Sequence, residues 1–205
     1  MHRLYEHLTL NDPPEPVDLV FVLAGRMERK RYGLELYGAG VAPRLLLSIG
    51  RFEVSRMPTV DFSAVDELIA LRNQLAPEER HFFCEINASG THIQRPRLRR
   101  WNTYGEILAL REFLKHNMPR SVIFVSTDVH LRRIAVTVDK VFHGVPLEVR
   151  YCPVPAKYNS LKEDHWWMRA EDRTYVLKET VKLAAYRVIL SMPERMIRRI
   201  MRLKG

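Results

Sequence analysis

The segment VSTDVHLRR (125–133) places a histidine and two arginines directly after the apolar run SVIFVST. Hydroxyl and guanidinium groups bind phosphate or carboxylate oxygens, and arginine does so with a bidentate fork. A histidine beside a bound anion can donate a hydrogen bond or act as a general acid to a leaving group. The segment therefore predicts an anion-binding site in which Ser126, Thr127 and Arg133 bind the ligand and His130 serves as the acid or base.

Two further apolar runs end in residues suited to the same task. Gly25 closes VDLVFVLAG and Arg29 follows it, while Ser48 and Gly50 close APRLLLSIG. Glycine lets a backbone N–H approach a bound anion closely, because no side chain stands in the way. We predict ligand-binding roles for these four residues.

The start of a predicted helix supplies further candidate residues, in addition to those that follow the three apolar runs. In WNTYGEILALREF, Asn102 or Thr103 caps a helix and Glu106 lies in its first turn. Free N–H groups at a helix start attract anions, so Asn102 and Thr103 are predicted ligand-binding residues. Glu106 is the second catalytic candidate, which would position a metal ion or a water molecule.

Each of these residues also has a purely structural explanation. Arginines in loops are mostly solvated, and a histidine at a helix start often caps or packs. The helix dipole accounts for Glu106, and an N-cap accounts for Asn102. Gly25 fits a simple turn, because LAGRM lacks the GxGxxG pattern. The functional interpretation rests on convergence, since separate turns carry the same chemistry.

These side chains meet only if the apolar runs are strands of one sheet. Such runs alternate with amphipathic segments, at residues 17–25, 42–50, 81–87, 121–127 and 146–154. Right-handed crossovers between parallel strands bring the strand-to-helix turns to one edge, where ligands bind. The predicted fold is α/β, a three-layer Rossmann-like fold with a mainly parallel five-stranded sheet and helices on both faces. Ser63 is the expected N-cap of a helix at 62–75.

The chain divides into an N-terminal extension (1–16), the α/β domain (17–192) and a basic amphipathic tail (193–205). In the tail, apolar residues share one helix face, with arginines beside or opposite it; these residues are Met196, Ile197, Ile200, Met201 and Leu203. Such a helix can make peripheral contact with an anionic membrane. The alternative is a terminal helix packed on the domain with a solvated basic face.

The composition restricts the compartment and the partners. Cys84 and Cys152 each lie in an apolar run, which indicates buried thiols in a reducing compartment. We expect a soluble, cytoplasmic protein, at most peripheral on the inner membrane face, because the sequence shows no signal peptide and no membrane-length apolar run. The net charge of +9 favours a small anionic ligand. A nucleic acid is not favoured, because the basic residues cluster at turns.

The motifs taken in order resemble the YdcF/SanA/ElyC-like family of bacterial proteins, over about residues 17–155. The chain departs from the family pattern at SIGRFE, where a second glycine is usual, and at Ile107, where an Asn is usual. It also shows no N-terminal apolar helix of the kind that many members carry. The positions that carry the resemblance are Gly25, Arg29, Tyr37, Ser48, Gly50, Asn102, Thr103, Glu106, Ser126, His130 and Arg133.

The resemblance implies a Rossmann-like fold, a nucleotide-like cofactor such as S-adenosylmethionine, and a role in cell-envelope and lipid-carrier metabolism, with no single reaction attached. Together with the residues, it favours a protein that binds a phosphate-bearing ligand, nucleotide or lipid-carrier-like, at the carboxyl edge of the sheet. A hydrolase or transferase, with a divalent metal ion beside a nucleotide, fits these residues. The alternative is an S-adenosylmethionine-binding protein, either non-catalytic or methyl-transferring, for which Glu53 is the nearest carboxylate to hold a ribose.

Overall fold

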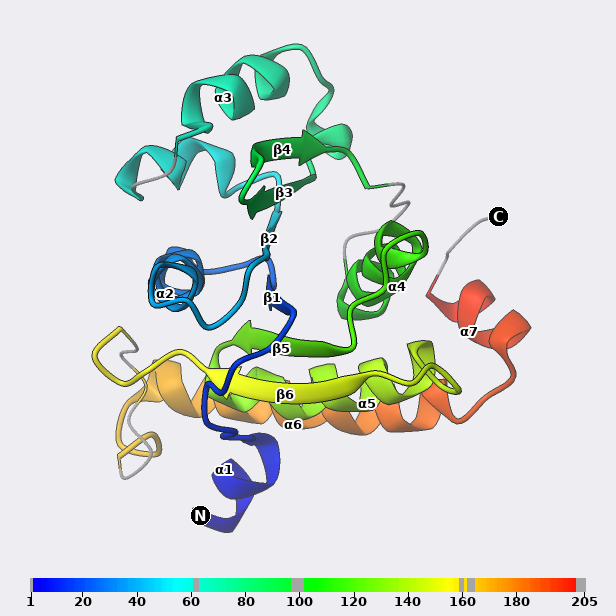
Figure 1. The fold of residues 1–205 in the computed structure, drawn as a ribbon. Coiled ribbons are helices and arrows are strands. Elements are labelled where there is room, and N and C mark those ends of the chain that lie inside the picture. The colour runs from blue at the N-terminus through cyan, green and yellow to red at the C-terminus, as the bar shows by residue number, and fades with distance from the viewer. Residues whose placement is uncertain (1, 61–62, 97–101, 159–160, 162–164, 202–205) are drawn as a thin grey trace.

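A six-stranded mixed sheet forms the centre of the computed structural model (Figure 1). The structure describes residues 2–60, 63–96, 102–158, 161 and 165–201. The strands stand in the order β4-β3-β2-β1-β5-β6, and β2, β1, β5 and β6 are parallel neighbours. In chain order they are β1 (Leu19–Val22), β2 (Leu45–Ile49), β3 (Phe82–Asn87), β4 (Gly90–Gln94), β5 (Ser121–Ser126) and β6 (Glu148–Pro153).

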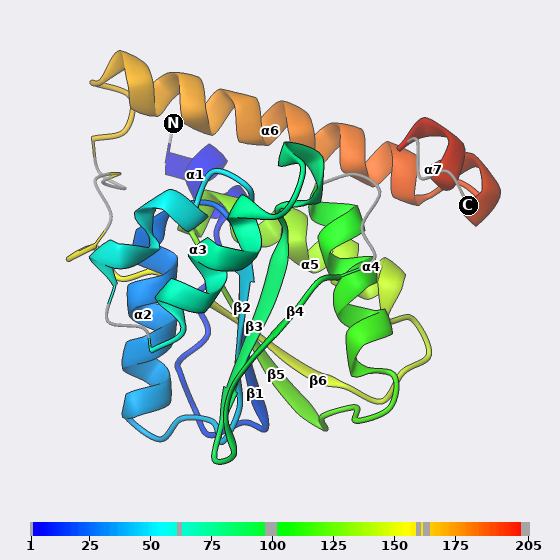
Figure 2. The same cartoon turned by 90° about the horizontal axis from the view of Figure 1, so that it is seen from above.

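Helices cover both faces of the sheet (Figures 1 and 2). Side chains alternate along a strand, so Val20 and Val22 of β1 face the core under α2 and α3, while Leu19 and Phe21 face the core under α4 and α5. The longest helix, α6, packs against α5. The helices of these layers are α2 (Met27–Gly38), α3 (Val65–Asn73), α4 (Thr103–Leu114), α5 (Leu131–Val141) and α6 (Ala170–Leu190), with short 3-10 turns η1 (Val54–Thr59), η2 (Pro77–Glu79) and η3 (Asp128–His130).

The α/β class is confirmed, but the prediction of a five-stranded, mainly parallel sheet is wrong on one side. β3 is antiparallel to β2, and Ile49 pairs with Phe82, so β3 begins at the edge where β2 ends. The connection through η1, α3 and η2 does not cross back to the start of the sheet. β4 then forms a hairpin with β3, which the polar sequence after Asn87 concealed. The hairpin turn ends at Gly90, whose φ of +118° lies in a region that favours glycine.

Local expectations have mixed outcomes. The Asn102 side chain accepts the N–H of Gly105 at 2.8 Å, which confirms it as the N-cap of α4. Ser63 does not cap α3, whose N-cap position is Ala64 without a side-chain bond; the Ser63 hydroxyl instead lies 3.3 Å from that of Thr91. Cys84 and Cys152 are buried and free, as predicted.

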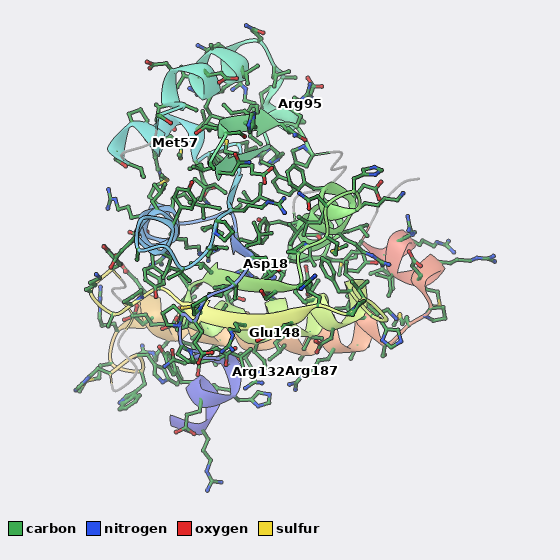
Figure 3. All side chains as sticks on the ribbon, viewed as in Figure 1. Asp18, Met57, Arg95, Arg132, Glu148 and Arg187 are labelled. Atoms are coloured by element: carbon green, nitrogen blue, oxygen red, sulfur yellow. The ribbon has the colours of Figure 1, made fainter. Side chains whose placement is uncertain are left out.

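The N-terminal segment folds onto the helices of the domain. Tyr5 and Leu8 of α1 (His2–Leu8) are buried in an apolar cluster with residues of α6. Arg132 of α5 donates to the backbone oxygen of His7 at 3.1 Å. Figure 3 shows Arg132 and Arg187 beside α1. The segment therefore braces α5, the helix that carries Arg133.

The prediction that the apolar residues of the tail share one face is wrong, because the C-terminal helix α7 (Glu194–Ile200) divides them between a packed face and an exposed face. Leu203 lies outside the described residues. Ile197 and Met201 are buried in the core on the α4 and α5 side. Met196 and Ile200 are 50% and 45% exposed. Among the described residues, no helix is both long and apolar enough to cross a membrane.

Candidate functional site

Buried polar side chains gather at the carboxyl ends of β1, β2 and β5. Each is at most 8% exposed, and among the described residues Thr137 is the one buried polar side chain outside the group. Eight of the eleven predicted site residues belong to it. We call the group the buried polar cluster; its members are Arg29, Lys30, Ser48, Glu53, Thr103, Glu106, Ser126, Thr127, His130, Arg133 and Glu179.

Glu53 joins the turns that follow β1 and β2. Its carboxylate accepts the backbone N–H of Gly50 at 2.6 Å and the backbone N–H of Gly25. The same carboxylate accepts from Nζ of Lys30 at 3.0 Å. The two glycine N–H groups that were predicted to bind a ligand are therefore occupied by a carboxylate of the protein itself.

Lys30 and Glu106 lie on either side of the end of β1. Nζ of Lys30 also donates to the carbonyl of Leu23 at 2.9 Å, and Glu106 accepts the N–H of Ala24 at 2.7 Å. Burial lowers the pKa of Lys30, although Glu53 opposes the shift. Burial raises the pKa of Glu106, against the hydrogen bond from Ala24. Both groups are thus held where ionisation is costly.

Arg29 is a buried cation that has no carboxylate partner in the described part of the chain. Its terminal nitrogens donate to the carbonyl of Ala24 and, at 2.9 Å, to Oγ1 of Thr127. Among the described residues, none forms a salt bridge with it. Among the described residues, its Nε has no hydrogen-bond partner. The hydroxyl of Ser48 is fully buried beside Glu106, where it opposes the rise in the pKa of that carboxyl. Arginine does not deprotonate, so this charge is buried with no ion pair to a described carboxylate.

His130 lies between two hydroxyl groups. Its Nδ1 is 2.9 Å from Oγ of Ser126, and its Nε2 is 3.3 Å from Oγ1 of Thr103. Burial lowers the pKa of His130 well below its usual value, and the charges of Arg133 and Arg29 lower it further. The ring is neutral at pH 7, so one nitrogen donates and the other accepts.

Arg133 is paired within the protein. Its Nε and Nη2 donate to one oxygen of Glu179 at 3.1 and 2.9 Å, and Nη1 donates to Thr103. Its guanidinium also lies 5.1 Å from the ring centroid of Tyr186. Glu179 is further held by Lys182 at 2.8 Å. Arg133 therefore anchors α6 to the site, and a ligand would have to share it with Glu179.

The exposed rim of the cluster is formed by the turn after β1 and by α6. Gly25 and Arg26 are exposed. The hydroxyl of Tyr175 lies 3.0 Å from that of Thr127, and the guanidinium of Arg26 lies 5.5 Å from the Tyr175 ring centroid. Tyr175 therefore connects α6 to Thr127 and to the turn after β1.

The three other predicted site residues border the cluster. Gly25 and Gly50 donate their N–H groups to Glu53. Gly25 has φ +136°, and a Cβ atom there would lie 2.8 Å from Nη1 of Arg29, so the position requires glycine. Asn102 uses its side chain as a helix cap, and its Nδ2 lies 3.9 Å from the sulfur of Met201. The family-resemblance residue Tyr37 lies away from the cluster, packed against the α2-side core.

Sequence reasoning missed Lys30 and Glu179 and left Glu53 outside the site. Lys30 follows Arg29 in ERKRY, where a run of charges resembles a solvated helix face. Glu179 lies in a helix that is otherwise amphipathic. A signal was available for Glu53, because it is the one acidic residue in the turn after β2 and follows Gly50, the last residue of an apolar run, by three positions.

The cofactor predictions have no further support in the geometry. Among the residues that the structure describes, no group of three or more His, Cys, Asp or Glu side chains could hold a metal ion. Both oxygens of Glu53 are already engaged, so the ribose of S-adenosylmethionine would have to displace Gly25, Gly50 or Lys30 from it.

Comparison of the chain with models of known protein families, with curated protein sequences and with solved structures gives no significant match.

Proposed function

We propose that the protein binds a small phosphate-bearing ligand at the carboxyl edge of β1, β2 and β5. The observation that carries the proposal is Arg29. It is 5% exposed, and among the described residues it has no carboxylate partner and its Nε has no hydrogen-bond partner. Its Nη2 donates to the hydroxyl of Thr127. An uncompensated buried guanidinium is costly, and an anion that pairs with it removes that cost.

Neighbouring hydroxyl groups could donate further hydrogen bonds to the oxygens of a tetrahedral anion held by Arg29. Thr127 already contacts Arg29, and the hydroxyl of Ser48 lies beside Glu106. His130 is neutral and lies between Ser126 and Thr103, so it can pass a proton through either hydroxyl. This arrangement fits a hydrolase or transferase acting on a nucleotide or a lipid-carrier-like phosphate, in which Arg29 holds the anion and His130 handles the proton.

The same residues support membership of the YdcF/SanA/ElyC-like family, which we also propose. Its motif positions Arg29, Ser48, Glu106 and His130 come from four separate segments and meet in one cluster. Under this proposal the ligand belongs to cell-envelope metabolism.

A thermal-shift screen tests the site. The panel holds nucleotides, nucleotide-sugars, prenyl phosphates and S-adenosylmethionine, each with and without magnesium. A ligand at 100 times its Kd should add about 2.7 kcal/mol, or roughly 5–10 °C in Tm for a chain of this length. The shift should shrink in Thr127→Val and persist in the exposed control Arg195→Ala. A flat panel, or a shift that Thr127→Val leaves intact, would contradict the site.

We further propose that α7 makes peripheral contact with an anionic membrane. The exposed Met196 and Ile200 lie among the exposed basic residues Arg195 and Arg199. Apolar side chains next to basic ones bind the interface of anionic bilayers. The wild-type protein should sediment with phosphatidylglycerol vesicles. The double variant Met196→Ser/Ile200→Ser should stay in the supernatant. Equal retention by phosphatidylcholine vesicles would contradict the charge argument.

A further inference from the structure

A second basic site lies on the outer side of the turn that follows β2. A pocket of about 380 Å³ opens there between η1, the end of α3 and η2. Figure 3 labels Met57 of η1, the element that forms one wall. Among the residues that the structure describes, no acidic residue lines this pocket. Four arginines line it, together with Phe52 and Ser55: Arg51, Arg56, Arg72 and Arg80. We call it the arginine pocket.

The four guanidinium groups have no counter-ions in the described part of the chain, where none of them forms a salt bridge. Nε of Arg72 is buried without a hydrogen-bond partner. Arg80 is positioned by the carbonyl of Leu75, which accepts from its Nε at 3.0 Å. Like charges drawn together without carboxylates repel, so the arrangement favours a bound polyanion.

In the described part of the chain, the acidic residues of α3 and η2 form no ion pair with the arginines of this pocket. Glu79 pairs with Arg95 at 2.9 Å. Asp66 and Glu67 lie in the first turn of α3, whereas Arg72 lies in its last turn. No described carboxylate therefore pairs with the arginines of the pocket.

An exposed aromatic ring stands at the edge of the same pocket. Phe52 is 71% exposed, and the guanidinium of Arg51 lies 4.4 Å from its ring centroid. A large apolar ring in water next to a row of cations is suited to stacking or covering an organic group attached to the anion. Burial, with the nearby charge of Arg51, also lowers the pKa of His81 to about 4, in keeping with a positive surround.

We propose that the arginine pocket binds the diphosphate group of an organic diphosphate ester, whose organic part packs on Phe52. Arginine forks match the oxygens of adjacent phosphate groups, and four of them supply enough charge for a diphosphate. The organic part comes either from a nucleoside or from a prenyl lipid, because both carry the same diphosphate chemistry. The arginine pocket lies outside the buried polar cluster, so this proposal does not depend on the proposed function.

Isothermal titration calorimetry tests the pocket with inorganic pyrophosphate, inorganic phosphate, ADP and farnesyl diphosphate. Pyrophosphate should bind more tightly than phosphate. The double variant Arg51→Ala/Arg56→Ala, at exposed positions, should raise the Kd for pyrophosphate by about tenfold or more for each arginine removed. Arg72→Ala/Arg80→Ala should have the same effect. The distant Arg195→Ala removes one exposed charge and should bind pyrophosphate as the wild type does.

The organic ligands identify the source of the diphosphate. A gain for ADP over pyrophosphate that Phe52→Ala abolishes points to a nucleotide, and the same result for farnesyl diphosphate points to a lipid. His130→Asn should leave pyrophosphate affinity unchanged, which separates this site from the buried polar cluster. The proposal is overturned if pyrophosphate does not bind, if both double variants bind it normally, or if Arg195→Ala weakens it equally.

Discussion

The carboxylate of Glu53 lies 3.0 Å from Nζ of Lys30, and the two side chains are 5% and 0% exposed. This pair joins the turn after β2 to α2, the helix that carries Lys30. Glu53 also accepts the N–H groups of Gly25 and Gly50, so the turn after β1 is joined to the same carboxylate. The turns that surround the candidate site are thus joined by one internal ion pair.

Removing the charge of Glu53 should destabilise the protein strongly. Glu53→Gln leaves Lys30 buried and unpaired, and breaking a buried pair in this way costs about 3–5 kcal/mol. Urea unfolding monitored by circular dichroism measures the change. The control is Glu35→Gln, which breaks the exposed pair with Lys157 at 2.8 Å and should change the free energy of unfolding little. Equal costs for the two variants would contradict the role of Glu53.

Gly25 should not tolerate a side chain. Gly25→Ala places a Cβ atom against Arg29 at a φ of +136° and should cost about 1–3 kcal/mol. Gly38→Ala is the matched control, because a Cβ atom there meets no other heavy atom within 4 Å. It should be neutral or slightly stabilising. The two melting temperatures provide the comparison, and a similar Tm for both variants would show that the turn is not constrained.

His130 should make the protein less stable as the pH falls. Its folded-state pKa is depressed, so the unfolded chain binds the proton more strongly below about pH 6.5. The stability is therefore fully present above that pH and is lost on acidification toward the folded-state pKa, by up to about 1.4 kcal/mol per pH unit. Urea unfolding of wild type and His130→Asn between pH 7 and 5 should show a shallower decline in the variant.

The exposed His143→Asn is the control for this series, and it should follow the wild type. His81, whose pKa is lowered to about 4, adds a decline of the same sign to all three proteins. Parallel curves for wild type and His130→Asn would show that His130 is not held neutral in the folded state.

Glu179 should determine how firmly α6 is held. Glu179→Gln leaves Arg133 buried without its carboxylate, and the expected cost is about 3 kcal/mol. Hydrogen exchange of the α6 amides around Val176 and Leu183 should become faster. Glu171→Gln, at the exposed start of α6, should leave exchange unchanged. Unchanged protection in Glu179→Gln would mean that apolar packing alone holds the helix.

The strand and helix pattern was predictable because burial on both faces leaves a strong signal. β1, β2 and β5 are almost wholly buried, and all were expected as continuous apolar runs. The hairpin of β3 and β4 was missed because β4 reads GTHIQ, an edge strand whose residues are exposed or half-buried. A polar strand of this kind is indistinguishable from a loop by hydropathy alone.

The sequence by itself determined the buried strands, the amphipathic helices that follow them and the residues that collect at their carboxyl ends, because apolar periodicity and strand-to-helix order are local properties. Eight of the eleven predicted site residues accordingly lie in one cluster. Only the tertiary structure decided the direction of β3 and the partner of each charge. Glu53 reaches Lys30 across 23 residues, and Glu179 reaches Arg133 across 46. Such pairings depend on how close the folded chain brings two segments and on burial, which makes an unpaired charge costly. Neither can be derived from the local sequence.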